Sequence, residues 1–453
     1  MKLLLTDIVK AVSGKLHGGD LLITGVSIDT RTLNPGDLYI AIQGRNFDGH
    51  VFVSTAEQKQ AAAVMVEHEC QTGLPQIIVE DTRLALAELA GFWRRKQNVK
   101  LVGVTGSNGK TTTKEMVTAI LNTQGKTLST QGNLNNDIGV PLTLLRLDES
   151  HQYAVIEMGA NHAGEIAYTS HYASPDVSII TNVGSAHLEG FGDLDGIAKA
   201  KGEIIASLNM EGVGVLNRDD TYYDFWLQTA GQRKTCSFGL SNNADVFADN
   251  IKTVLNNQGF MTRFELRTAT VQMPLSIALA GEHNVKNALA AIAATMQFGI
   301  DPAQIKSGLE QIKPVKGRMQ FLLGRKGNVV INDSYNANPS SLEASLDVLD
   351  KDSCNWLVLG AFGELGENSS AIHREMGVLI KSRPVQRLFA TGELARHTVE
   401  SFGAGGEFFD TQEKLIAAVT HAITGKETLL IKGSRAQKME NVVAALVDNF
   451  RAE

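Results

Sequence analysis

The chain of 453 residues has only three cysteines, no long run of apolar residues and no dense block of lysine and arginine. Cys70, Cys236 and Cys354 lie far apart without metal-ligand spacing, which indicates reduced structural thiols in a cytoplasmic protein. Asp7 and Lys10 interrupt the apolar N-terminus before it reaches the length of a signal-peptide core, and no segment is long enough to span a bilayer. The formal net charge of −7 leaves no basic footprint, so we expect neither a nucleic-acid partner nor a membrane span.

What the chain does contain is a series of short apolar strands that alternate with helical segments. At 453 residues it exceeds what a single hydrophobic core usually serves. Because the strands of the middle region are apolar throughout, we expect a mostly parallel sheet with helices on both faces. These strands are expected at residues 100–106, 153–159, 177–184 and 212–220.

Two features predict where this series begins and ends. A segment with helical spacing at residues 84–97 ends in basic residues, which suits a helix C-terminus, and Lys313-Pro314 marks a hinge because proline resists helix continuation. The sequence therefore predicts an α/β protein of three domains. Their expected limits are residues 1–97, 98–313 and 314–453, the last being a doubly wound α/β domain.

The stretch VTGSNGKTTTKE, residues 104–115, follows an apolar strand and enters a helix whose apolar side chains fall on one face. Unpaired backbone N–H groups and the helix dipole favour an anion at such a junction. The side chains expected on the buried face are Met116, Val117, Ile120 and Leu121.

This loop resembles a nucleotide-binding phosphate loop with one departure from the pattern. Lys110 is placed to reach the β and γ oxygens and Thr111 to ligate magnesium, but Val104 stands where the pattern has its first glycine. The alternative is a Gly-rich turn with an adjacent lysine that binds no phosphate. A dinucleotide loop is disfavoured because its glycine pattern cannot be aligned.

Three further donors lie at or after the ends of segments expected to neighbour one another in the central sheet. They are Glu157, His187 and Lys201. In an open α/β sheet ligands bind at this carboxyl edge. A lone loop histidine is often structural, and Lys201 can equally be a solvated lysine on a helix face. The Gly-rich, polar setting of His187 favours a functional role.

At this point the chain resembles a known family, the Mur ligases, which are the ATP-dependent amide ligases of peptidoglycan precursor synthesis. The family commonly lacks the early glycine that Val104 replaces. The similarity runs along the whole chain in order, and the motifs that carry it are SIDTR, PGDLYIAIQG, TGSNGKTT, GNLNNDIGVP, EMGANHAGEI, AHLEGFG, AKAKGE, LNRDD, GEHNVKNALAA, GRMQ, NDSYNANP and IKGSR.

Within the family, GNLNNDIGVP, DSYNANP, GELG and KGSR resemble the member that adds a terminal dipeptide. The resemblance implies that UDP-N-acetylmuramoyl-tripeptide and D-alanyl-D-alanine are the substrates of a monomeric enzyme. Addition of a single amino acid to a UDP-muramoyl peptide is the alternative within the same chemistry. A nucleotide-dependent switch or motor is the alternative outside it, and the chain lacks the Asn-Lys-x-Asp motif that a G protein would carry.

The resemblance also implies ATP and two magnesium ions. Thr111 and Glu157 would hold the first ion and His187 the second, with Lys201 carbamylated so that it becomes a carboxylate-like ligand; Lys199 is the alternative alignment. The residues implied at the nucleotide are Thr105, Gly106, Ser107, Asn108, Gly109, Lys110, Thr111, Thr112, Asn284, Asn287, Arg318 and Asp333.

The remaining implied residues belong to the two other substrates. The UDP-sugar pocket would use Ser27, Asp29, Thr30, Arg31, Gly44, Arg45 and Asn46, and the passage to the peptide carboxylate Asn133, Asn135, Asn136 and Asp137. The tripeptide end and the dipeptide would use Asn336, Asn338, Lys432, Ser434 and Arg435. The bland alternatives are a polar turn at residues 29–31, a hinge salt link for Arg318 and Asp333, and solvated side chains for Lys432 and Arg435.

Overall fold

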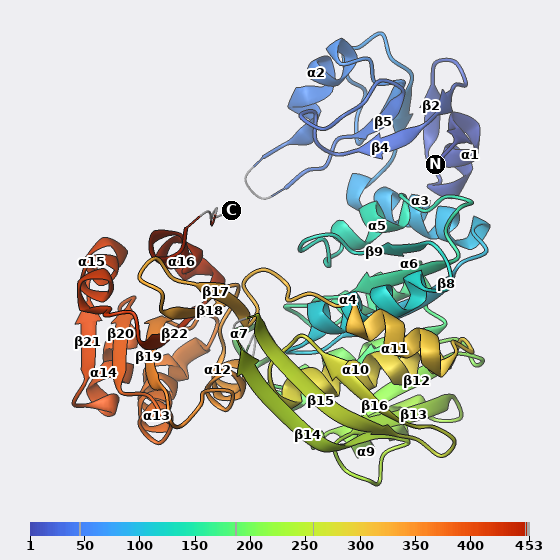
Figure 1. The fold of residues 1–453 in the computed structure, drawn as a ribbon. Helices are drawn as coiled ribbons and strands as arrows, with labels where there is room; N and C mark the ends of the chain where they lie inside the picture. The colour runs from blue at the N-terminus through green and yellow to red at the C-terminus, as the bar shows by residue number, and fades with distance from the viewer. Residues whose placement is uncertain (45–46, 186–187, 257, 449, 451–453) are drawn as a thin grey trace.

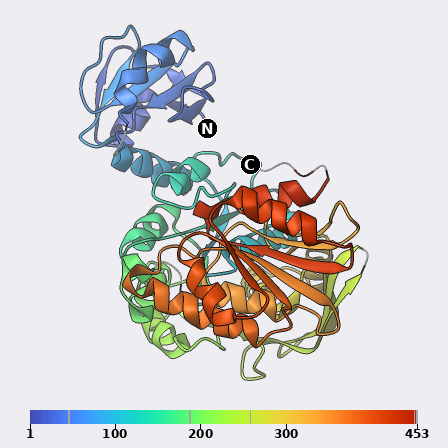
Figure 2. The same cartoon turned by 90° about the vertical axis from the view of Figure 1, so that its left-hand side faces the viewer.

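The computed structural model describes residues 1–44, 47–185, 188–256, 258–448 and 450. Three large sheets follow one another along the chain and define an N-terminal, a central and a C-terminal domain (Figure 1). The N-terminal domain stands at one end of the central domain, whereas the C-terminal domain lies against its side (Figure 2). Among the described residues, no helix is both long and apolar enough to cross a membrane.

The N-terminal domain is built on a five-stranded sheet whose strands are parallel except for β2 at one edge. The order is β2 (Lys15–His17), β7 (Gln76–Ile78), β6 (Ala63–Val66), β5 (Asp37–Ile40) and β4 (Gly25–Ser27). A short antiparallel pair, β1 (Leu3–Leu4) with β3 (Leu22–Ile23), lies beside α1 (Leu5–Ala11), and the remaining elements are η1 (Gly49–Phe52) and α2 (Val53–Gln58).

Helix α3 (Thr82–Lys96) leads from this domain into the next and confirms the helix predicted at residues 84–97. The Asp81 side chain caps its first turn by accepting hydrogen bonds from two backbone N–H groups, and three basic residues end its last turn, as the helix dipole favours. Helix α3 packs on α1 and also on α5 (Gly139–Leu144) and α6 (Glu165–Ala173) of the central domain.

The central domain contains a nine-stranded sheet in which the four predicted strands are adjacent, in the order β12-β11-β8-β10. Every neighbouring pair from β14 across to β9 is parallel, whereas β15 and β16 extend the sheet beyond β14 as an antiparallel meander. The full order is β16 (Gln272–Ile277), β15 (Gly259–Arg267), β14 (Val246–Asn256), β13 (Lys234–Gly239), β12 (Val213–Asn217), β11 (Val177–Ile180), β8 (Lys100–Thr105), β10 (Tyr153–Glu157) and β9 (Thr127–Ser129).

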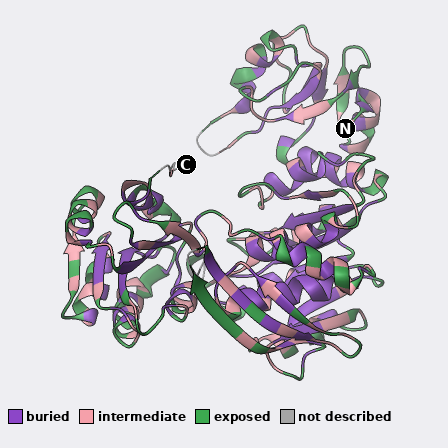
Figure 3. Ribbon diagram, viewed as in Figure 1, coloured by how far each residue is buried: buried purple, intermediate pink, exposed green. Residues whose placement is uncertain are grey.

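Helices cover both faces of this sheet, because successive strand residues point to opposite cores. Leu101 belongs to the core beneath α6, α8 (Leu194–Ala206) and α9 (Tyr223–Ala230), whereas Val102 belongs to the core beneath α4 (Lys110–Asn122), α10 (Gly281–Met296) and α11 (Pro302–Glu310). Strand residues are therefore mostly buried, while the outer stretch of β14 is exposed (Figure 3). The four apolar residues predicted on one face of α4 are all fully buried, which confirms that helix.

The C-terminal domain is doubly wound, as predicted. Its six-stranded sheet has the order β17 (Gln320–Leu323), β18 (Val329–Asp333), β22 (Glu427–Lys432), β19 (Cys354–Gly360), β20 (Arg387–Thr391) and β21 (Gly406–Phe409), with only β17 antiparallel to its neighbour. Separate cores form on its two faces. The helices are α12 (Pro339–Leu346), α13 (Ser369–Lys381), α14 (Ala395–Phe402), α15 (Gln412–Ala422) and α16 (Glu440–Leu446), with the short elements η2 (Gly366–Asn368) and η3 (Arg435–Gln437). The short helix α7 (Leu188–Phe191) belongs to the central domain.

Close packing of α11 on α4, the helix that follows the phosphate loop, predicts the effect of one substitution. A Cβ on Gly308 would stand 2.5 Å from Ile120 Cα and 2.8 Å from Ile120 N, so Gly308→Ala must push two helices apart. We expect a loss of about 1–3 kcal/mol in the free energy of unfolding, measured with urea. Gly19→Ala is the control because no atom lies within 4 Å of its added Cβ. A Gly308→Ala variant as stable as the control would contradict this packing.

Candidate nucleotide and metal site

The phosphate loop is the turn between β8 and α4, and glycines shape it. Gly106 has φ +148° and Gly109 has φ +81°, and a Cβ on Gly109 would stand 2.3 Å from Asn287 Oδ1. Lys110 begins α4, and its ammonium donates to the Gly106 carbonyl at 2.6 Å and to the Ser107 carbonyl at 3.1 Å. The loop thus presents the N-terminus of a 13-residue helix with a lysine folded over it.

Side chains at the end of β11 hold the loop in place. Asn182 accepts a hydrogen bond from Asn108 N at 3.0 Å and returns one to Asn108 O at 3.1 Å, and Thr181 Oγ1 donates to the same oxygen at 2.6 Å. Sequence reasoning missed both residues, although β11 pairs with β8 and the carboxyl-edge rule points to them. The same rule applies to Asp219 and Asp220, which follow β12 and line the same cavity.

Glu157 ends β10 opposite Val104 of β8 and is 3% exposed. Its Oε1 accepts a hydrogen bond from Asn135 Nδ2 at 2.8 Å, whereas its Oε2 is buried without a partner among the described residues. A buried anionic oxygen without a donor is costly unless a cation satisfies it. Together with the nearby Thr111 hydroxyl at the start of α4, these oxygen donors suit magnesium.

Lys201 lies on α8 and is 2% exposed, so the alternative of a solvated lysine is wrong. Lys199, two residues earlier, is exposed. No hydrogen bond or ion pair reaches the Lys201 ammonium from the described part of the chain, and burial together with the Lys110 charge holds its pKa well below the usual range. A lysine in this state is readily neutral and nucleophilic. The predicted metal ligand His187 lies outside the described residues.

Arg318 brings the C-terminal domain to the loop. Its Nη2 donates to Thr111 Oγ1 at 2.9 Å, its guanidinium lies 4.4 Å from the centre of the Tyr335 ring, and its Nε is buried without a partner in the described residues. Burial lowers the pKa of Lys110, and the Arg318 charge adds to this while Glu157 opposes it. Lys110 and Arg318 thus bring two cationic groups together at the phosphate loop, which suits a polyphosphate.

Asp333 and Lys432 form a buried ion pair at the carboxyl ends of β18 and β22. Asp333 also accepts hydrogen bonds from Ser345 Oγ and Met319 N, so it does not pair with Arg318 as a hinge salt link. Lys432 is 2% exposed, and the alternative of a solvated side chain is wrong for it. Arg435 has a half-exposed side chain whose Nη1 pairs with Glu440 at 2.9 Å.

Asn284 and Asn287, the residues predicted at the base, lie in the first turns of α10 and are nearly buried. Asn287 Nδ2 donates to Asn284 Oδ1 at 3.1 Å, and Asn284 Nδ2 donates to Ala280 O at 2.8 Å. The same Nδ2 lies 3.1 Å from His283 Nε2, which must therefore accept and carry no proton. Burial accordingly lowers the pKa of His283, a cavity residue that sequence reasoning missed, to about 4.

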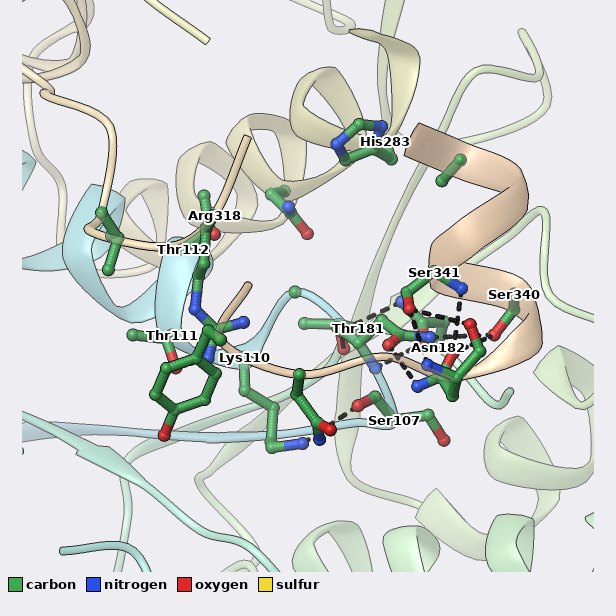
Figure 4. Close-up of a pocket in the computed structure, with 18 of the residues that line it drawn as sticks. Ser107, Lys110, Thr111, Thr112, Thr181, Asn182, His283, Arg318, Ser340 and Ser341 are labelled. Carbon is green, nitrogen blue, oxygen red and sulfur yellow. Dashed lines mark hydrogen bonds between the residues drawn. The ribbon is translucent and has the colours of Figure 1, made fainter. Parts of the chain in front are cut away.

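A cavity of about 580 Å³ between the central and C-terminal domains collects most of the predicted residues (Figure 4). None of its described lining residues comes from the N-terminal domain, so the predicted UDP-sugar set lies elsewhere. Of the predicted residues, it is lined by Ser107, Asn108, Gly109, Lys110, Thr111, Thr112, Asn133, Asn135, Asn136, Glu157, Asn284, Asn287, Arg318, Asp333, Asn336, Asn338 and Lys432. Thr105, Gly106, Asp137, Lys201, Ser434 and Arg435 are not among its described lining residues.

The predicted UDP-sugar residues are partly engaged with one another. Ser27 Oγ donates to Asp29 O at 2.9 Å, and Arg31 pairs with Asp29 at 2.7 Å, which lowers the pKa of that carboxyl. Gly44 N donates to Phe47 O, and Arg45 and Asn46 lie outside the described residues. Asp137 pairs with Arg83 of α3 and so links the central domain to the N-terminal one.

Comparison with known proteins agrees with this architecture. Three family models match in chain order: "Mur ligase family, catalytic domain" at residues 22–94, "Mur ligase middle domain" at 104–295 and "Mur ligase, glutamate ligase domain" at 317–435. The UDP-N-acetylmuramoyl-tripeptide–D-alanyl-D-alanine ligase of Escherichia coli (strain K12) is 41% identical over 449 residues, 98% of each chain. The chain belongs to the Mur ligase family.

Solved structures place this Mur ligase among proteins of the same three-domain form. A crystal structure of MurF from Acinetobacter baumannii has a TM-score of 0.93 and 35% identity, and covers 98% of both chains. The MurF ligase of Thermotoga maritima in complex with ADP has a TM-score of 0.82 and 27% identity, and covers 93% of this chain and 96% of that one.

The neutral state of the half-buried His283 predicts how stability depends on pH in this Mur ligase. The unfolded imidazole takes up a proton near its ordinary pKa of about 6.5, whereas the native one resists protonation until about pH 4. The native state therefore loses stability as the pH falls through this window. Between pH 7 and about pH 4.5, we expect the free energy of unfolding of His283→Asn to fall by on the order of 2 kcal/mol less than that of the unsubstituted protein, measured with urea.

His421→Asn provides the control, because His421 is exposed on α15 and its replacement should leave the pH profile unchanged. Parallel profiles for the unsubstituted protein and both variants would contradict a neutral, half-buried His283.

Proposed function

We propose that the chain is an ATP-dependent ligase that joins D-alanyl-D-alanine to UDP-N-acetylmuramoyl-tripeptide through an acyl-phosphate intermediate. The observation that carries this proposal is the similarity, over almost the whole chain, to a ligase named for that reaction. The cavity supports it because two buried atoms without partners in the described residues, Glu157 Oε2 and Arg318 Nε, belong to residues that line it beside the phosphate loop. Such atoms suit a cation and a phosphate oxygen respectively.

The reaction needs activation because a carboxylate is a poor electrophile. A carboxylate oxygen of the tripeptide attacks the γ-phosphorus of ATP, the bond to the β–γ bridging oxygen breaks, and ADP leaves. The amine of the dipeptide then attacks the acyl carbon, and the new amide nitrogen loses a proton. The bond from the acyl carbon to the bridging oxygen breaks, and phosphate leaves with that oxygen. Both steps depend on positioning and on neutralisation of charge.

The phosphate loop and Arg318 supply that neutralisation from two domains. Lys110 donates to two carbonyls of its own loop, and we infer that its ammonium exchanges them for the more favourable charged oxygens of the β and γ phosphates. The Nε of Arg318 then reaches the γ-phosphate. Because Arg318 comes from the C-terminal domain, contact between the domains completes the site and keeps water from the acyl phosphate.

Thr111 and Glu157 are the residues we assign to a first magnesium ion, and His187 with Lys201 to a second. Bound magnesium would neutralise the γ-phosphate and the carboxylate so that the two anions can approach. Lys201 can serve as a ligand once carbon dioxide has carbamylated its neutral amine, and its burial and lowered pKa favour that neutral form.

The remaining assignments concern substrates and domain limits. We assign the UDP-sugar to the N-terminal domain near Asp29 and Arg31. We assign the dipeptide carboxylate to Arg435, whose paired guanidinium is half exposed, whereas Lys432 is buried in its ion pair with Asp333. The domain limits that we propose are 1–97, 98–313 and 314–453. We propose that the enzyme works as a monomer, in the cytoplasm where ATP is available.

Phosphate release with each substrate omitted in turn tests the proposed function. We expect release only when UDP-N-acetylmuramoyl-tripeptide, D-alanyl-D-alanine and ATP are all present, with the pentapeptide product identified by mass. A panel of single amino acids in place of the dipeptide should give no product. Release that ignores both cosubstrates would point to a nucleotide switch, and a product with one added amino acid would point to another Mur ligase reaction.

Replacing Arg318 separates catalysis from folding. Arg318→Ala removes the guanidinium donors at the phosphates, and we expect kcat to fall by about a hundredfold or more with little change in the melting temperature. Arg396→Ala is the control because Arg396 lies on the surface of the same domain, paired with Glu393 and Asp410. Unchanged turnover of Arg318→Ala would end this assignment.

Carbon-13 bicarbonate tests the carbamate directly. We expect a carbamate resonance in the protein by NMR, lost in Lys201→Arg and retained in Lys199→Ala, since only Lys201 is buried. A resonance that survives Lys201→Arg, or none in the unsubstituted protein, would exclude Lys201 as the modified residue.

A further inference from the structure

A closed ring of three hydrogen bonds joins the tip of the phosphate loop to the start of α12. Asn338 Nδ2 donates to Asn108 Oδ1 at 2.8 Å, Asn108 Nδ2 donates to Ser340 Oγ at 3.0 Å, and Ser340 Oγ donates to Asn338 Oδ1 at 3.0 Å. Each of the three side chains thus gives one ring hydrogen bond and receives one. In Figure 4, Ser340 lies where the dashed bonds connect α12 with the loop.

The hydrogen bonds that cap α12 determine which atoms of the ring donate and which accept. Asn338 caps α12, and its Oδ1 also accepts a hydrogen bond from Ser341 N at 2.9 Å. The amide group of Asn338 must therefore turn its Nδ2 toward Asn108, which in turn has to present Oδ1 to Asn338 and Nδ2 to Ser340. A reversed amide at residue 108 would place two N–H donors against each other.

The central domain also holds its side of the ring, Asn108, in a fixed position. The backbone of Asn108 is held at both N and O by Asn182, and at O by Thr181 as well. The chain at Gly184 lies so close that a Cβ there would stand 2.6 Å from Ser340 Oγ and 3.1 Å from Asn108 Nδ2. A side chain at this position would therefore displace the Ser340 hydroxyl from the ring.

Two separate contacts thus fix the C-terminal domain against the phosphate loop. The ring holds the tip of the loop, and the hydrogen bond from Arg318 to Thr111 holds the first turn of α4. A single contact would leave the C-terminal domain free to pivot, whereas two set its orientation. The reach of Arg318 toward a phosphate depends on that orientation.

We propose that Asn338 and Ser340 are positioning residues that hold the C-terminal domain on the phosphate loop during phosphoryl transfer. The inference rests on the proposed function and deepens it. It also replaces the expectation that Asn338 contacts the peptide substrates, because every polar atom of its carboxamide is engaged by the ring and by the cap of α12.

Two substitutions break the ring in different ways. Asn338→Asp keeps an oxygen to cap α12 but removes the donor and sets a carboxylate oxygen against Asn108 Oδ1. Ser340→Ala removes only the hydroxyl. We expect Ser340→Ala to lower kcat about three- to tenfold and Asn338→Asp to lower it further. KM for the UDP-tripeptide should stay unchanged, because its UDP-sugar part is assigned to the N-terminal domain, away from the ring.

Leu342→Ala is the matched control in the same helix. Its side chain is fully buried in the core of the C-terminal domain and does not line the cavity, so its loss weakens the packing of α12 and leaves the hydrogen-bonding groups of the ring in place. We expect a lower melting temperature and an unchanged kcat. If all three variants changed kcat in proportion to their loss of stability, the ring would have a structural role only and the proposal would fail.

A double variant tests whether the ring acts as a unit. Asn108→Ala already removes both bonds to the loop, so adding Ser340→Ala should lower kcat no further. Independent effects that multiply in the double variant would overturn the proposal.

A measurement without turnover separates this proposal from the proposed function. By small-angle X-ray scattering, Asn338→Asp and Ser340→Ala should have a larger radius of gyration than the unsubstituted protein, whereas Leu342→Ala should not. If the unsubstituted protein released phosphate without both substrates, the proposed function would fail. The comparison of radii of gyration would still test whether the ring holds the two domains together. Equal radii of gyration for the ring variants and the unsubstituted protein would contradict the proposed role of the ring, even if the enzyme is active.

Discussion

Buried charge that the described chain leaves without a partner is the constraint on which this site depends. Glu157 keeps one carboxylate oxygen unpaired inside the protein, Arg318 keeps its Nε unpaired, and Lys201 has no counter-ion in the described residues. Leaving such groups uncompensated costs several kcal/mol each, which a stable fold tolerates when ligands repay it. Glu157 at the end of β10 and Arg318 at the start of the C-terminal domain both line one cavity, so the fold brings these two groups together there.

The phosphate loop reaches the same place by an unusual route. Val104 occupies the position of the early glycine in the common pattern, and the structure shows why a glycine is unnecessary there: β8 continues through Thr105, and Val104 is fully buried in the sheet. The chain turns only at Gly106, where a Cβ would stand 1.8 Å from Thr181 Oγ1. The loop is therefore shorter and more dependent on its neighbours, and side chains from β11 and α12 hold it.

Sequence reasoning recovered much of this arrangement, because local patterns determine it. The four central strands, the buried face of α4, the doubly wound C-terminal domain and the placement of Glu157 at the carboxyl edge all follow from apolar periodicity and chain order. Periodicity cannot show which residues meet across domains. Lys432 is 99 positions from its partner Asp333, and Ser340 is 232 from Asn108, so neither pairing has a local signal.

His283 shows a second limit of the sequence. Beside two asparagines in a helix start, its neutral state depends on one shared N–H and on burial under another domain. Asn135 similarly combines a place in the predicted substrate passage with a hydrogen bond that orients Glu157. Such double roles emerge only when the packed site is seen as a whole.

The central claim is that this loop delivers a phosphoryl group to a peptide carboxylate, and isotope transfer tests it most directly. UDP-N-acetylmuramoyl-tripeptide labelled with oxygen-18 in its carboxylates would be converted with ATP and D-alanyl-D-alanine, and the released phosphate analysed by mass. An acyl-phosphate route predicts one labelled oxygen in each phosphate released. Phosphate without label would show that water, and not the carboxylate, accepts the phosphoryl group, and would contradict the account.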